Sequence, residues 1–284
     1  MFNPTAILAD KLGEHLAGTY LQYFSHRRPE YADYIGGAAR LCLERIGNSN
    51  ALYHDVEHTI MVVLVGQQIL RGRLHASSIT PEDWLHFVCT LLVHDIGFVR
   101  GVCPGDTDRA VVVDETGRTV APPRGASDAA LAPFHVDRGK IYARARFGPS
   151  LMIEEERVCR GIEMTRFPPP EGAFYRETET EAGLVRMADP FYHRKITALF
   201  REFEETGMAS ELGLGDAADL ADTYPRFFRA QVEPLIQPAL GYLSLTTEGK
   251  QWIANLDSNL YQVERAASRI GPFRGAGSGP DPGA

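Results

Sequence analysis

The sequence lacks the features that identify membrane, disulfide-rich and secreted proteins. Its 284 residues contain no uninterrupted apolar run of about 18, the length that a membrane-spanning helix needs. The four cysteines are far apart and form no C-x-x-C pair, which argues against a zinc knuckle or a thioredoxin-like site. The first residues carry charges where a signal peptide has an apolar stretch. We therefore expect a cytoplasmic protein with no membrane partner.

Positive charge is also scarce. The 29 basic residues are outnumbered by 37 acidic ones, so the formal net charge is −8. We expect no non-specific binding to nucleic acid, because such binding needs clustered basic residues that displace counterions from phosphates. A small anionic substrate stays compatible with this charge, since a bound metal ion can outweigh nearby carboxylates.

The apolar content, 44%, is sufficient for a globular core. Only the segment 271–284, rich in Gly, Pro and Ser, differs in composition from the rest. The sequence therefore predicts a single helical domain over residues 1–270 and a flexible tail over 271–284. The oligomeric state stays open, and a homo-oligomer is compatible with the sequence.

Helical spacing of apolar residues dominates the chain. It extends over 4–24 and 30–46, continues from the histidine-rich segment at 54 into the apolar stretch 60–70, and resumes at Thr80-Pro81, a strong helix start. Gly97 is a suitable stop for that fourth helix. Further helices are expected over 127–147, 150–167, 178–189, 191–206, 216–230, 231–246 and 247–269. The predicted fold class is all-α.

Between Phe98 and Ala126 the helical pattern breaks into Pro, Gly and Asp. One short apolar piece there predicts a small hairpin that turns at Asp114 to Gly117. A connection of this length in a compact domain is often functional, and a lid over a site is one role open to it.

Two histidine-containing motifs carry the chemistry. In Tyr53-His54-Asp55-Val56-Glu57-His58, the two histidines are four residues apart. If the helix begins at or before His54, both imidazoles lie on one face, about 6 Å apart. The second motif, His94-Asp95, ends a strongly apolar helix, where both residues are costly to bury without partners.

Each motif alone is a weak signal, because such histidines are common on surfaces and in satisfied cores. Together they favour a metal site, since both flank long apolar helices. Imidazole and carboxylate ligands suit zinc, manganese or iron, and carboxylate oxygens also admit magnesium. We therefore expect one or two divalent ions as cofactor.

The motifs resemble a known superfamily. His58, His94-Asp95 and a later aspartate resemble the H…HD…D pattern of HD-domain metal-dependent phosphohydrolases, and YHDVEHTIMV is similar to a segment of the cyclic-nucleotide phosphodiesterases. The resemblance spans roughly residues 20 to 265. It is especially close to uncharacterised bacterial HD-domain proteins with the phrases LLVHDIGFVRGVC, EDWLHF, IEMTRFP and EGKQWIANL. It implies a phosphodiesterase-like multi-helix bundle with a long loop insertion after the HD motif.

The resemblance also implies residue roles. His58, His94 and Asp95 would be metal ligands, and His54 would protonate the leaving oxygen while a metal-activated hydroxide attacks phosphorus. Asp55 or Glu57 could orient the His54 imidazole, although a solvated helix face explains both equally well.

The fourth ligand is open between two assignments. Asp189 follows an apolar helical segment and matches the position of the later aspartate, but Pro190 comes immediately after it. The segment is therefore shorter than in the family pattern. Either Asp189 is the ligand and Pro190 ends the helix, or Asp189 corresponds to a later Asp-Pro and the ligand is missing.

Five further residues are candidates for a second metal or for substrate binding. His135 resembles the histidine that two-metal HD proteins supply after the HD motif, although an ordinary buried histidine explains it equally well. Arg138 and Lys140 follow it as candidate phosphate contacts. Thr165 and Arg166 lie where phosphodiesterase-like proteins carry Thr-Asp, and the arginine could contact phosphate or be a surface charge.

The function expected from these observations is metal-dependent hydrolysis of a small phosphorylated substrate, a phosphodiester or phosphomonoester of nucleotide type. Two alternatives stay open. One is a di-iron oxygenase, since some HD-domain proteins hold iron. The other is a catalytically degenerate HD domain that binds a ligand or a partner, which loss of the Asp189 ligand would produce.

Overall fold

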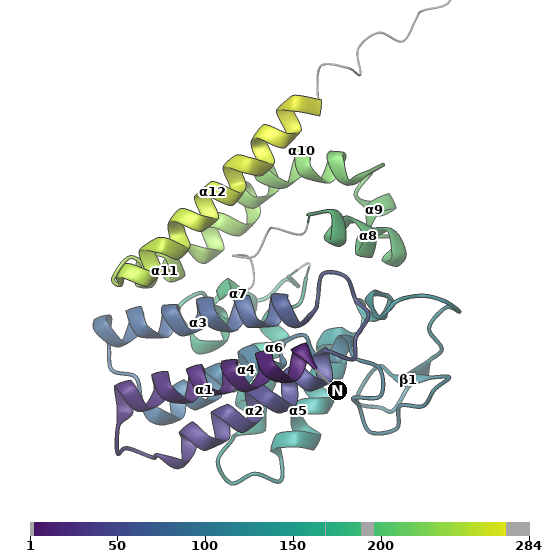
Figure 1. The fold of residues 1–284 in the computed structure, drawn as a ribbon. Coiled ribbons are helices and arrows are strands. Elements are labelled where there is room, and N and C mark those ends of the chain that lie inside the picture. The colour runs from purple at the N-terminus through teal and green to yellow at the C-terminus, as the bar shows by residue number, and fades with distance from the viewer. Residues whose placement is uncertain (1–2, 168, 189–195, 271–284) are drawn as a thin grey trace, which may run out of the picture.

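The computed structural model describes residues 3–167, 169–188 and 196–270. Helices make up 68% of it and strands 2%, which confirms the predicted all-α class. The first seven α-helices form one bundle, drawn from purple to teal in Figure 1. Their bounds are α1 Pro4–Phe24, α2 Glu30–Ile46, α3 Val56–Ala76, α4 Pro81–Val93, α5 His135–Phe147, α6 Glu155–Met164 and α7 Glu181–Ala188.

The remaining helices lie along one side of this bundle, against α3 and α7 (Figure 1). They are α8 Ile196–Thr206, α9 Met208–Glu211, α10 Ala217–Phe227, the π-helix Phe228–Val232, α11 Glu233–Leu243 and α12 Thr247–Ile270. One apolar core runs from Ala9 in α1 to Leu260 in α12, so both groups of helices share it. No helix of the described residues is both long and apolar enough to cross a membrane.

The crossing of α3 and α11 depends on a glycine. A Cβ atom at Gly72 would lie 1.9 Å from the carbonyl oxygen of Tyr242, so no larger residue lets the two backbones approach this closely.

Local signals explain where several helices begin. Asn3 caps α1 and Pro4 occupies its first turn. Thr80 and Asp83 form a reciprocal capping box at the start of α4. The bounds of α1 and α2 are those that the apolar spacing predicts, because both helices have apolar stripes that face the shared core.

Other predicted bounds were wrong. Asp55 is the cap of α3, so His54 precedes the helix. Gly97 does not stop α4, which ends at Val93. It lies instead in a 3₁₀ turn, η1 Ile96–Phe98. The segment 127–147 divides into a 3₁₀ turn, η2 Asp128–Leu131, and α5, because Pro133 lies between them.

The long connection after His94-Asp95 contains the predicted hairpin. Strands β1 Val111–Val112 and β2 Thr119–Val120 pair antiparallel, and Gly117 adopts a φ of +80° in the turn. A short 3₁₀ turn, η3 Phe174–Arg176, precedes α7. The predicted ligand Asp189 and the tail 271–284 lie outside the described residues.

Candidate metal centre

Three buried side chains at the ends of two helices converge at one point. His58 lies in the first turn of α3, where its N–H donates to the Asp55 carboxylate at 2.9 Å. His94 caps the carboxyl end of α4, and Asp95 follows it. The Nε2 atoms of His58 and His94 lie 3.1 Å and 3.0 Å from the same atom, Oδ2 of Asp95.

This arrangement could hold a metal ion. One donor atom from each of His58, His94 and Asp95 lies within 4.8 Å of the other two, and all three residues are buried. Two imidazole nitrogens and one carboxylate oxygen form a donor set that suits zinc, manganese or iron. Burial of such groups is costly without charge compensation, and a bound cation would supply it. The donor set therefore fits the predicted cofactor.

The tautomer of His94 is fixed by its backbone contact. Its Nδ1 lies 2.7 Å from the carbonyl oxygen of Leu91, which can only accept a hydrogen bond, so Nδ1 carries the proton. The neutral ring then presents the lone pair of Nε2 toward Asp95, as a metal ligand requires.

The charge on Asp95 is stabilised locally. Burial acts to raise the pKa of this carboxyl, but the imidazoles of His94 and His54 and the contact with His58 hold its pKa well below the ordinary value. Asp95 is therefore an anion, the form that binds a cation.

His54 lies beside this cluster although it is not helical. Its ring centroid is 5.6 Å from that of His58. Its Nδ1 lies 2.6 Å from Oε2 of Glu202, a residue of α8 that is only 3% exposed. Glu202 also accepts the N–H of Tyr53 at 2.6 Å. The carboxylate that orients the imidazole is thus Glu202, and Asp55 caps α3 instead.

Sequence reasoning missed Glu202 because it stands in an ordinary amphipathic helical segment and has no spacing relation to His54.

 

The helix itself reads ITALFREFEET and carries two other acidic residues, Glu204 and Glu205, that look equivalent in the sequence. Only the tertiary fold selects Glu202, by burying it against the start of α3. Burial acts to raise the pKa of this carboxyl, but the hydrogen bonds with His54 and with the Tyr53 backbone hold its pKa below the ordinary value.

An aromatic ring holds the other face of His54. The imidazole stacks on Phe98 with ring centroids 4.1 Å apart and planes 14° from parallel. Phe98 in turn stacks on His135 at 4.6 Å and 18°. Phe98 belongs to the 3₁₀ turn that directly follows His94-Asp95, so this turn links His54 and His135 to the candidate metal centre.

His135 is brought to the site by its stacking on Phe98. It begins α5, its ring lies 6.4 Å from that of His54, and its Nδ1 donates to the carbonyl of Ala132 at 2.6 Å. Its Nε2 is therefore the nitrogen open to a ligand. Burial lowers the pKa of His135, which favours the neutral, metal-binding form. Its role as a second metal ligand stays a prediction.

A glycine permits this close approach of η1 to α5. A Cβ atom at Gly97 would lie 1.9 Å from the carbonyl oxygen of His135. The predicted helix stop is in fact a packing position that places Phe98 and His135 side by side.

Arg138 has a structural role, which corrects its assignment as a phosphate contact. The residue is fully buried, and all five of its N–H groups have partners. Two donate to the Asp106 carboxylate at 2.9–3.0 Å, and three donate to the carbonyls of Gly97, Val99 and Val112. Arg138 thus anchors the loop after His94-Asp95 to α5, and none of its N–H groups is left for a substrate.

Lys140, Arg166 and Thr165 also have partners within the protein. Both cations pair with Asp137 and Glu163, at distances of 2.6–2.9 Å. Burial acts to raise the pKa of Glu163, but hydrogen bonds from Arg166, Lys140 and Tyr175 lower it to about 2. The Thr165 hydroxyl donates to the carbonyl of Ile162 at 2.8 Å. A phosphate would have to displace carboxylates from this network.

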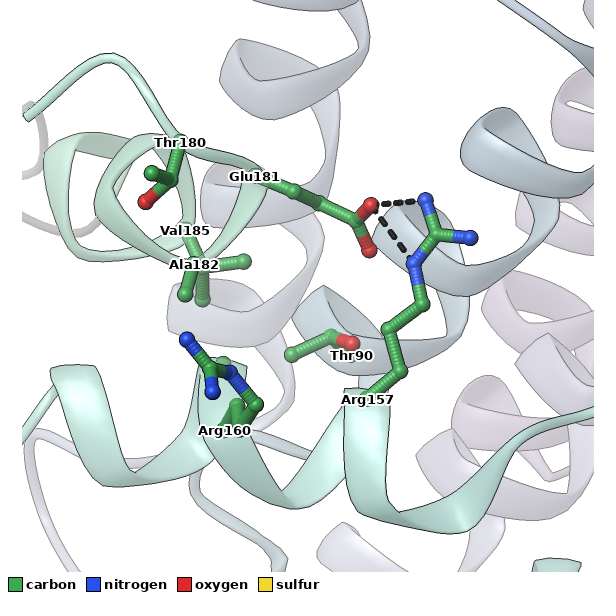
Figure 2. Close-up of a pocket in the computed structure, with 8 residues that line it drawn as sticks. Thr90, Arg157, Arg160, Thr180, Glu181, Ala182 and Val185 are labelled. Carbon is green, nitrogen blue, oxygen red and sulfur yellow. Dashed lines mark hydrogen bonds and ion pairs between the residues drawn. The ribbon is translucent and has the colours of Figure 1, made fainter.

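A separate pocket of about 180 Å³ lies between α4, α6 and α7. Arg157 crosses it to reach Glu181, while the Arg160 guanidinium lies beneath Ala182 (Figure 2). None of the residues that line the pocket belongs to the metal centre, so it is a distinct feature of the molecule.

The fold and the buried cluster define a helical protein with a candidate His-His-Asp metal centre. A family model described as Npun_R2479-like matches residues 2–266, and the chain therefore belongs to the Npun_R2479-like family. No curated protein matches the sequence. The family name specifies no reaction, so the argument for function depends on the site.

Proposed function

We propose that this protein is a metal-dependent phosphohydrolase that acts on a small phosphorylated substrate of nucleotide type. The observation that carries the proposal is the meeting of His58, His94 and Asp95 at one buried point, with the Nε2 atoms of both histidines 3.0–3.1 Å from one carboxylate oxygen. The resemblance of these residues to the H…HD pattern supports the reaction class. The choice of a nucleotide as the type of substrate rests on that resemblance alone.

In this proposal His58, His94 and Asp95 hold a divalent cation, with Asp189 as a further ligand. When bound, the cation supplies a Lewis acid for the phosphoryl group and activates water as the nucleophile. The protein prepares the site in advance, because the Asp55 cap places His58 at the start of α3 and the contact with the Leu91 carbonyl orients His94 at the end of α4.

His54 acts as the proton donor to the leaving oxygen. Its Nδ1 faces Glu202, so a proton on Nε2 gives an imidazolium that the buried carboxylate stabilises. Glu202 thus has the role of the orienting acid in a catalytic dyad: it fixes the ring and the tautomer, while the other nitrogen exchanges the proton. The His54 side chain is 21% exposed, which leaves a path to substrate.

Phe98 completes the arrangement. Its stacking on His54 restricts rotation of the imidazole and removes water from one face of the ring. Fixed orientation of an acid relative to its substrate contributes to catalysis because the entropic cost of alignment is met during folding.

The test is hydrolysis of a chromogenic phosphodiester and a chromogenic phosphomonoester in the presence of Mn²⁺ or Mg²⁺. We expect turnover by the wild type and its loss in His94→Ala, with the helical circular dichroism unchanged. His75→Ala is the matched control, because His75 is an exposed histidine at the end of α3. Equal turnover by both variants, or turnover that persists after removal of all metal, would contradict the proposal.

A further inference from the structure

Arg138 and Arg186 both hold their guanidinium groups inside the protein, but they differ in their surroundings. Every N–H of Arg138 has an acceptor. In Arg186, by contrast, Nε and both Nη atoms are inaccessible to solvent, and within residues 3–167, 169–188 and 196–270 none of them has a hydrogen-bond partner.

The helix that carries Arg186 is enclosed. α7 packs against α3, α4, α6 and α11, and its other residues from Ala182 to Ala188 are all buried. The acid on the same helix, Glu181, does not reach Arg186 but pairs with Arg157 (Figure 2). The positive charge of the Arg186 guanidinium is therefore balanced neither by contact with solvent nor by a carboxylate of the described residues.

A buried guanidinium without a partner destabilises the fold, and it cannot avoid this cost by losing its proton. Burial lowers the pKa of Arg186, but a guanidinium stays protonated near neutral pH. An unpaired buried charge destabilises a fold, and buried polar groups in native proteins almost always have partners. Because no described residue fills this role for Arg186, a bound anion is the partner that its chemistry requires.

We propose that Arg186 is the anchor of a binding site for a phosphate group. A guanidinium presents five N–H donors in a planar fork, which suits bidentate binding of an oxyanion. Phosphate fits better than a carboxylate, because its additional oxygens can accept from more of the three buried nitrogens. The inference does not depend on the proposed hydrolysis, since Arg186 is not among the candidate metal ligands.

The experiment is thermal unfolding of the full chain in EDTA, with inorganic phosphate titrated against chloride at constant ionic strength. Phosphate should raise the melting temperature of the wild type, by roughly 5 °C at about 100 times the dissociation constant. Acetate should raise it less. A parallel titration with a nucleoside monophosphate identifies the source: a larger shift than with inorganic phosphate indicates an organic phosphate ligand, and a smaller one indicates the free ion.

Arg186→Met is the decisive variant. Because it replaces an uncompensated charge by an apolar side chain, its melting temperature without phosphate should equal or exceed that of the wild type, and its phosphate shift should vanish. Arg160→Met is the matched control, because Arg160 is an exposed arginine on the neighbouring pocket and should leave the shift intact.

Three results would overturn the inference. The first is the absence of a phosphate shift in the wild type. The second is loss of the shift in Arg160→Met with retention in Arg186→Met. The third is failure of Arg186→Met to fold, or a lower melting temperature without phosphate, because either would show that Arg186 already has a partner within the chain.

Discussion

The Nδ1 atom of His54 lies 2.6 Å from Oε2 of Glu202, although 148 residues separate them in the sequence. The contact joins the segment before α3 to α8 and thus links the two groups of helices. It also distinguishes the two imidazole nitrogens, since Nδ1 contacts the buried carboxylate and Nε2 is the nitrogen that can donate a proton to a substrate in the proposed reaction.

Replacement of Glu202 by Gln should reduce turnover and disturb the His54 ring. We expect kcat to fall about 100-fold, the lower end of what a positioned acid contributes, with a smaller change in KM. Imidazole nitrogen NMR should show the Nδ1–H tautomer of His54 in the wild type and a mixture in Glu202→Gln. An unchanged tautomer in the variant would show that Glu202 does not position His54.

The same pair should make stability depend on pH. Burial acts to raise the pKa of Glu202, but its hydrogen bonds with His54 and the Tyr53 backbone lower it below the ordinary value of 4.5. A carboxyl with a depressed pKa stabilises the fold above its ordinary pKa and loses this contribution as the pH falls through the folded value.

The wild type should therefore be more stable than Glu202→Gln at pH 7, and the difference should shrink as the pH falls below 4.5. Melting temperatures of both proteins across this range provide the measurement. If the difference in melting temperature instead grew as the pH falls, the contacts of Glu202 would raise its pKa in the folded protein, which would contradict the prediction.

Arg138 should be essential for stability. Its removal leaves the buried Asp106 carboxylate and three carbonyls without their donor. We expect Arg138→Met to lower the free energy of unfolding by about 3–5 kcal/mol in urea titrations. The exposed pair of Arg118 and Asp114 provides the control, and Arg118→Met should cost less than about 1 kcal/mol. Similar effects of the two substitutions would argue against the anchoring role.

Gly97→Ala should disturb the metal centre through packing. The added Cβ would collide with the carbonyl of His135, so η1 and α5 must separate. We expect a loss of about 1–3 kcal/mol of stability and weaker metal binding. Gly37 in α2 has open space around it, and Gly37→Ala should be neutral or stabilising by about 0.5–1 kcal/mol. Equal effects at the two glycines would contradict this explanation.

These residues show what the sequence could predict. The convergence of His58, His94 and Asp95 was predictable, because strong local signals mark both helices and place the motifs at their ends. The partners Glu202 and Arg138 were not. Whether an acid in α8 or a cation in α5 contacts solvent, substrate or another buried group depends on which distant segments fold against it.

The central claim is that the buried histidines and Asp95 bind a metal ion. The most direct test is elemental analysis of the purified protein, with metal counted per chain after Mn²⁺, Mg²⁺, Zn²⁺ or Fe²⁺ is supplied. The variants are Asp95→Ala, which removes the shared carboxylate, Asp189→Ala, which tests the remaining predicted ligand, and the control His75→Ala. Iron in the wild type would direct the next assay to oxygenase chemistry.

We expect one or two ions per chain in the wild type and in His75→Ala, and a loss in Asp95→Ala. A partial or complete loss in Asp189→Ala would identify Asp189 as a ligand. A wild type without metal under all four conditions, or an Asp95→Ala variant that retains its full metal content, would contradict the account.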